Sequence, residues 1–112
     1  MTKIDAGKLR SRVKLQRQVK SVDTRGAASD WVTVSTRWAS VTMLRGSELE
    51  IQRKTFARAT TKIIMRKPTD FDFGANWRVC HGGNVYGINY AGTTGEKSED
   101  LELICEGVNV NV

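Results

Sequence analysis

Apolar and polar residues alternate along several short segments of the chain, and this alternation is typical of half-buried β-strands. In residues 13–19 the apolar side chains share one parity, and the lysine and both glutamines share the other. Residues 31–44 form a longer segment in which the apolar positions change parity near Trp38. This change predicts a bulge or a bend, which would allow a sheet to curl into a barrel.

Further strand segments follow in the second half of the chain, separated by turn residues. Pro68 ends the first of them because proline has no N–H for a strand ladder. Gly82 and Gly83 indicate a tight hairpin, since both can adopt positive φ. The remaining predicted strands are 61–66, 77–80, 85–90 and 101–106. The predicted connections are loops at 23–30, 67–76 and 91–100, followed by a tail or edge extension at 107–112.

A helix signal stands between the second and third predicted strands. Ser47 follows Gly46, and Glu50 lies three residues after the serine, which is the spacing of a capping box. The apolar stripe that follows is thin. We therefore expect either a short surface helix or one that becomes buried against a partner, and residues 55–60 would also suit an extended chain.

Together these segments predict a mainly all-β fold. We expect residues 1–112 to form a single domain, a small antiparallel β-barrel of five to six strands. One short helix or long protruding loop is expected at 46–58. OB-like and SH3-like barrels both agree with this pattern, and the three tryptophans are expected to help fill the interior.

Charge is unevenly distributed along the chain. Residues 1–66 hold 15 basic and 5 acidic groups, a net charge of +10, whereas residues 67–112 hold 3 basic and 7 acidic groups, a net charge of −4. The basic part could face nucleic acid, or the basic face of one subunit could meet the acidic face of a neighbour. A solvated surface that keeps the protein soluble is the third interpretation.

The sequence offers no persuasive enzyme site. His81 is the single histidine, and its neighbour Cys80 would point to the opposite face of a strand. Cys80, Cys105 and one imidazole make a poor zinc site, so we expect no catalytic residue, no cofactor and no metal. No apolar run is long enough to span a membrane, and no secretory signal is expected, so the thiols should be reduced in a cytoplasm.

A nucleic-acid-binding module is the main alternative from the residues alone. Residues 3–25 carry eight basic groups, and Arg12, Lys14 and Lys20 would share the polar face of the first strand. Such a stripe could follow a phosphate backbone. The tyrosines that could stack on bases lie far along the chain, so they are expected in or beside the core.

The order of the segments resembles that of the phage head–tail joining family, also called head-closure, stopper or connector proteins. The residues that carry the resemblance lie in most of the predicted elements. They are GKLRSRVKLQR at 7–17, the loop at 23–26, Trp31, WASV at 38–41, LRGSEL at 44–49, KIIMR at 62–66, VYGI at 85–88 and LELICE at 101–106. Each is weak alone, but their order and spacing are fairly specific.

This resemblance implies a structural virion protein without enzyme activity. Members form a homo-oligomeric ring, often dodecameric, between the portal–adaptor complex and the tail of the phage. The ring closes the DNA-filled head, retains the packaged DNA without sequence specificity, and docks the tail terminator or tail tube. The protein would be assembled in the bacterial host cytoplasm and located at the neck of the virion.

The candidate contacts of such a ring lie in two segments, 46–58 and 67–76. Both carry aromatic or aliphatic groups without a clear intramolecular core face, so they could contact neighbours or narrow the channel. A solvated basic helix is an equally good interpretation of the first. The candidate residues are Arg45, Gly46, Ser47, Glu48, Leu49, Arg53, Lys54, Phe56, Arg58, Phe71 and Phe73.

Overall fold

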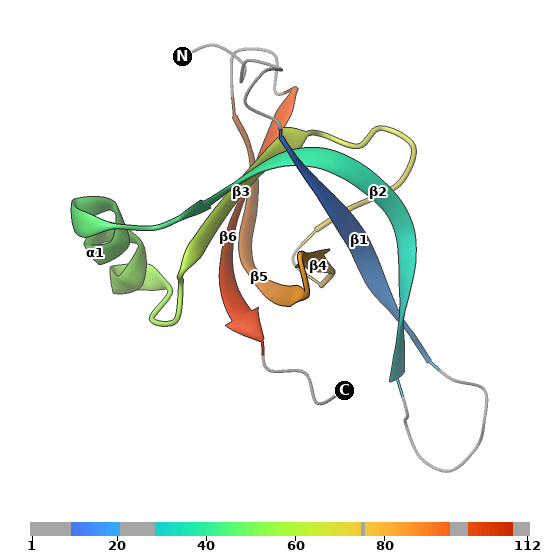
Figure 1. Ribbon diagram of the computed structural model, residues 1–112, viewed down its shortest axis with the longest axis horizontal. Coiled ribbons are helices and arrows are strands. Elements are labelled where there is room, and N and C mark those ends of the chain that lie inside the picture. The colour runs from blue at the N-terminus through green and yellow to red at the C-terminus, as the bar shows by residue number, and fades with distance from the viewer. Residues whose placement is uncertain (1–9, 21–28, 75, 95–98, 109–112) are drawn as a thin grey trace.

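The computed structural model describes residues 10–20, 29–74, 76–94 and 99–108 (Figure 1). Within these ranges the chain forms six strands and one helix, and the strands close into one antiparallel barrel. The elements are β1 (Ser11–Lys20), β2 (Ser29–Met43), α1 (Gly46–Thr55), β3 (Thr61–Arg66), β4 (Arg78–His81), β5 (Asn84–Thr94) and β6 (Asp100–Val108). The predicted fold class, an all-β barrel with one short helix, is confirmed.

The order of strands around the barrel is β1-β2-β3-β6-β5-β4. The long strand β2 pairs with β1 along residues 29–39 and with β3 along residues 39–43. In Figure 1 it arches over the barrel from α1 to the far end of β1. Since β2 and β5 are three positions apart in a ring of six strands, they lie on opposite sides of the barrel.

Two irregularities in register help the sheet to curl. Leu15 pairs with Ser35 but Gln16 pairs with Thr33, so Val34 is the extra residue of a bulge in β2. A second irregularity lies in β5. A bulge in the long strand was expected near Trp38, and the structure places it four residues earlier.

Alternate residues of the strands build the barrel interior. In β3 the burial alternates along the whole strand. The core residues are Val13, Leu15, Ala39, Ile63, Met65, Trp77, Val79, Ile88, Leu101, Leu103 and Cys105. These side chains come from all six strands and from the residue that precedes β4, so one contiguous core holds the barrel together.

The tryptophans depart from the expectation that all three would fill the interior. Trp77 is buried in the core, but Trp31 is half-buried and Trp38 is 51% exposed. Trp38 alternates with Ala39, which points inward, so its own side chain lies on the outer face. The outer tryptophans are therefore available for contacts outside the core.

Some predicted boundaries also change. Residues 91–94 belong to β5 and pair with β6, so the expected loop at 91–100 is wrong at that end. Residues 107 and 108 extend β6 and pair with β5, which agrees with the edge extension. Ser29 and Asp30 belong to β2. Residues 23–28 and 95–98 of the predicted loops lie outside the described residues, and so do residues 109–112 of the predicted tail. Residue 99 is described, and residue 100 begins β6.

Candidate interaction surfaces

The helix α1 stands outside the barrel and touches it through a small cluster. Ile104 on the outer face of β6, with Leu44 and Ala59 beside it, forms a buried group on which Leu49 and Phe56 pack. No residue of α1 itself is buried, and Figure 1 shows the helix projecting from the side of the barrel. The expectation that this segment lacks an intramolecular core face is therefore wrong for these two side chains.

The helix begins earlier than the predicted capping box. Its N-cap is Arg45, with no hydrogen bond from a capping side chain, so Ser47 does not cap it. Gly46 has a φ of 57°, a left-handed conformation that favours glycine. The chain turns at this glycine directly after β2, which places the serine within the first turn rather than before it.

Two of the charged candidates, Glu48 and Arg53, form hydrogen bonds that fix segment 46–58 to neighbouring parts of the chain. Glu48 accepts a bond from Lys62 of β3 at 2.8 Å, and Arg53 Nε donates to the carbonyl oxygen of Ala59 at 3.1 Å. Arg45, Lys54 and Arg58 are exposed, and they share this surface with an exposed apolar residue, Ile51. These four side chains belong to the exposed part of the segment, which also includes the acidic Glu50.

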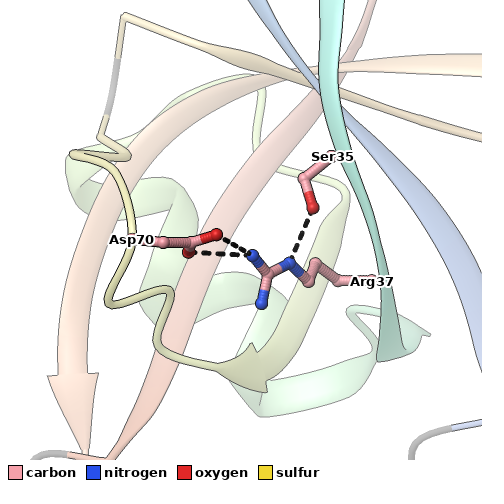
Figure 2. A network of polar contacts seen from close by, with 3 residues as sticks. All are labelled: Ser35, Arg37 and Asp70. Atoms are coloured by element: carbon pink, nitrogen blue, oxygen red, sulfur yellow. Dashed lines mark hydrogen bonds and ion pairs between the residues drawn. The ribbon is translucent and has the colours of Figure 1, made fainter.

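The connection between β3 and β4 is fastened to β2 by polar contacts (Figure 2). Both oxygens of the Asp70 carboxylate accept bonds from Arg37 Nη2, at 2.9 and 3.1 Å. Arg37 Nε also donates to the Ser35 hydroxyl at 2.8 Å, and the guanidinium lies 5.4 Å from the ring centroid of Phe71. Arg37 of β2 therefore holds the β3–β4 connection through Asp70 and Phe71.

The two phenylalanines of this connection pack inward. Phe71 stacks on Trp77 with ring centroids 5.3 Å apart, and Phe73 meets the same indole edge-on at 5.1 Å. Both lie against the barrel core. The premise that they lack a core face is wrong, because Trp77 directly before β4 supplies that face. Their role in an interface stays a prediction that the packing does not favour.

An exposed aromatic surface that the sequence reasoning missed lies on β1 and β2. Trp38 pairs across the strands with Arg12, whose guanidinium carbon lies 4.9 Å from the centroid of the indole ring. Arg12 and its neighbour Lys14 are exposed. The sequence contained a signal for it, because neighbours in a strand point to opposite faces and an inward Ala39 therefore requires an outward Trp38. We call these three residues the Trp38 surface.

An open groove of about 320 Å³ lies over the β4–β5–β6 side of the barrel. Its floor includes Gly87 and Ile88, and Glu106 and Val108 of β6 line one part of it. Trp31 and Arg78 line another part, with the guanidinium 4.5 Å from the indole centroid and its Nε bonded to Gln16. A Cβ at Gly87 would lie 3.2 Å from Val108 Cγ2, so the Val108 side chain packs closely over this glycine.

The structure places the two cysteines that were considered for a thiol or zinc site on separate strands. Cys80 and Cys105 are free thiols on strands that do not pair with each other. Burial raises the pKa of the Cys105 thiol to about 12. In the described ranges no three His, Cys, Asp or Glu side chains group as metal ligands. No helix in the same ranges is long and apolar enough to cross a membrane.

Comparisons with known proteins agree with this architecture. The family model described as phage head completion protein matches residues 4–108. A Shigella flexneri 2a protein, solved in solution, is 24% identical over 96% of this chain and 100% of its own, with a TM-score of 0.73. A chain in the virion of a native gene transfer agent particle is 17% identical over 88% of this chain and 94% of its own, with a TM-score of 0.59. The search of curated proteins found no match.

Proposed function

This chain belongs to the phage head completion protein family, and from that membership we propose that it closes the head of a tailed phage particle and joins it to the tail. The family consists of structural virion proteins rather than enzymes. We propose that copies of the chain form a ring, dodecameric as the family resemblance implies, between the portal–adaptor complex and the tail terminator or tail tube. The ring would lie at the neck and be assembled in the bacterial host cytoplasm.

One observation carries the proposal: the family model covers residues 4–108, which is nearly the whole chain and every described element. The physical form of the protein supports it. A closed barrel is a rigid body because its strands pair all the way round. The helix α1 adds a projection that is held to that body by the packing of Leu49 and Phe56 and by the Glu48–Lys62 ion pair. Such a projection is suited to contacts with other molecules.

The outward residues of α1 suggest how the ring would act on DNA. Arg45, Lys54 and Arg58 are exposed cations on one projecting segment. Repeated around a channel, they would attract phosphates of the packaged duplex without reading its sequence. The same cations could instead contact acidic groups of adjacent neck proteins. Glu48 and Arg53 would act indirectly, by holding the segment against β3 and Ala59.

The direct test is electron microscopy of particles produced without this protein. We expect heads that are filled or leaking, separated from complete tails. Particles that join and retain DNA normally would contradict the proposal. The test does not require the isolated protein to form a ring, since recruitment by the portal side could be needed first.

A second test addresses α1 alone. The variant Lys54→Glu with Arg58→Glu reverses two exposed charges without touching the apolar cluster that anchors the helix. Lys67→Glu, at an exposed position in the β3–β4 connection, is the matched control. We expect the α1 variant to lower the yield of infectious particles at least tenfold and the control to leave it unchanged. Equal yields would remove the α1 cations from the mechanism.

The nucleic-acid-binding module remains the second candidate. The exposed Arg12 and Lys14 beside an exposed indole favour it, because cations and aromatic faces are what single-stranded nucleic acids contact. Its separate test is the salt dependence of DNA binding by the isolated chain.

A further inference from the structure

We propose that the Trp38 surface of one copy docks into the groove over Gly87 of the next copy, and that this is the contact from which the ring is built. The inference rests on the proposed ring and names the residues that join its subunits. Its occupant is a second copy of this chain.

The Trp38 surface has the properties of an interface anchor. Trp38 is 51% exposed, although the barrel core lies directly beneath the strand that carries it. Its indole is oriented by Arg12 on the neighbouring strand, at 4.9 Å. Tryptophan and arginine are the residues most enriched where interfaces hold most of their binding energy. A preoriented indole also loses little conformational freedom when it binds.

The groove has the complementary form. Ile88 and Val108 give it apolar surface, and its volume of about 320 Å³ has room for one bicyclic aromatic side chain. The Val108 side chain packs closely over Gly87, so a larger residue at position 87 would push against Val108 and change the groove lining. An indole that entered would lie among lining residues that include Trp31 and Arg78, whose guanidinium lies 4.5 Å from the Trp31 ring centroid. Offset or edge-on contact of the two indoles would add to the apolar burial.

Charge is complementary as well. Arg12 and Lys14 make no ion pair among the described residues, and Glu106 at the edge of the groove makes none within that same set. The cation in the groove, Arg78, is already stacked on Trp31 and bonded to Gln16. Docking would bring two cations to one carboxylate, in agreement with the opposite net charges of the two parts of the chain.

The placement of the two surfaces separates them within one copy. Trp31, the β2 residue that lines the groove, lies seven residues before Trp38 on the same strand, roughly 20 Å away along an extended chain, and Gly87 lies on β5. Each copy therefore presents the Trp38 surface at one place and the groove at another. An interface between different surfaces repeats from copy to copy, and it closes into a ring when the rotation between copies permits.

The test is photocrosslinking in assembling particles, with p-benzoylphenylalanine in place of Trp38 and, as the matched control, in place of the exposed Ile51 of α1. We expect position 38 to give chain–chain products whose crosslinks map to 76–78, 87–89 or 106–108. Position 51 should give no product at those residues. Crosslinks from position 38 to another protein, or to other parts of this chain, would overturn the inference, and so would the lack of any product.

A second measurement uses substitutions that block one surface each. Gly87→Leu fills the groove and Trp38→Ala removes the knob. In the crosslinking assay, Gly87→Leu should lower the multimer yield from position 38 at least tenfold. Arg12→Glu alone and Glu106→Arg alone should each lower the multimer yield. The double variant, in which the two charges are exchanged, should restore that yield. Circular dichroism confirms that each variant is folded.

Particle joining separates failure of this inference from failure of the proposed function. Should Gly87→Leu and Trp38→Ala particles join heads to tails normally, while particles without the protein do not, the chain is a head completion protein that uses another contact. Should particles without the protein also join, the function itself is wrong.

Discussion

At the scale of single residues, two ion pairs of similar length differ in burial. Arg66 Nη1 lies 3.0 Å from Asp100, whose side chain is 1% exposed, whereas Arg37 Nη2 lies 2.9 Å from Asp70, whose side chain is 65% exposed. A buried carboxylate depends strongly on its partners, but an exposed one is well solvated without them. The pairs should therefore contribute unequally to stability.

We predict that Arg66→Ala lowers the free energy of unfolding by about 2–3 kcal/mol, because it removes a cation from a buried carboxylate. Asp70→Ala should cost less than about 1 kcal/mol, as expected for a solvent-exposed pair. Urea denaturation at pH 7 measures both values, and Lys67→Ala is the surface control. A larger loss for Asp70→Ala would show that the β3–β4 connection depends on the Arg37 contact.

The buried thiol of Cys105 predicts a dependence of stability on pH. Burial raises its pKa from 9.0 to about 12. Above pH 9 the unfolded thiol loses its proton while the folded one keeps it, so unfolding becomes easier as the pH rises, until the folded thiol ionises near pH 12. The slope from this group reaches about 1.4 kcal/mol per pH unit.

Cys105→Ala removes this contribution. The stability difference between wild type and variant should be constant between pH 7 and 8 and should shrink between pH 9 and 11. Denaturant unfolding at each pH gives the difference, and subtracting the variant removes the effect of other titrating groups. A difference that stays constant up to pH 11 would contradict the assignment.

Residue parity predicted much of the interior but not the partners of the aromatic residues. The alternation in 13–19 placed Val13 and Leu15 on one face, and both are buried, because period two is a local property. The inward packing of Phe71 and Phe73 depends on Trp77, which meets them only after the barrel closes. Such contacts are tertiary, so no local pattern contains them.

At the scale of elements, α1 is attached weakly. It touches the barrel through Leu49, through Phe56 directly after the helix, and through the exposed Glu48–Lys62 ion pair. Phe56 also lies 6.2 Å from Tyr90, measured between ring centroids. A ten-residue helix is marginal in water without tertiary contacts. The helix should therefore open more readily than the barrel strands.

We predict that Phe56→Ala increases amide hydrogen exchange across residues 46–55 while protection of β3 and β6 is retained. The loss of a half-buried ring should cost about 1–3 kcal/mol, less than a fully buried phenylalanine. Ile51→Ala, at a position 60% exposed on the same helix, should leave the exchange of α1 nearly unchanged. Equal effects of the two changes would show that the helix does not rest on the small cluster.

The existence of this helix was predictable, but its start was not. Glycine and serine after a strand indicated a helix in the right place. Whether the helix starts at a serine cap or at a glycine turn depends on where the chain leaves the barrel after β2. The chain is still fixed at Leu44, whose N–H donates to the Thr60 carbonyl oxygen at 2.9 Å. The hairpin at Gly82 and Gly83 was easier to predict from the sequence, because two consecutive glycines allow a tight turn, and both do adopt positive φ.

At the scale of the whole molecule, the net charge of +6 is divided between opposing elements. The strand β1 carries the exposed cations Arg12, Lys14 and Arg17, and β6, three positions away in the ring of six strands, carries Glu102 and Glu106. A protein that binds DNA by itself gains from cations gathered on one face, whereas a head-to-tail assembly gains from opposite charges on opposite faces. The arrangement therefore favours the ring over the nucleic-acid-binding module.

We predict that the isolated chain binds DNA only at the level of phosphate attraction, with a Kd of about 10⁻⁴–10⁻⁶ M at physiological salt. Fluorescence anisotropy with labelled duplex and single-stranded DNA, from 50 to 200 mM salt in ~50 mM steps, measures the affinity and its slope. The slope is that of the logarithm of the binding constant against the logarithm of the salt concentration. Arg12→Glu with Lys14→Glu should reduce its magnitude by about two if both cations contact phosphates. Binding a thousandfold tighter than predicted, with a preference for single strands, would instead assign the Trp38 surface to base stacking and favour the nucleic-acid-binding module.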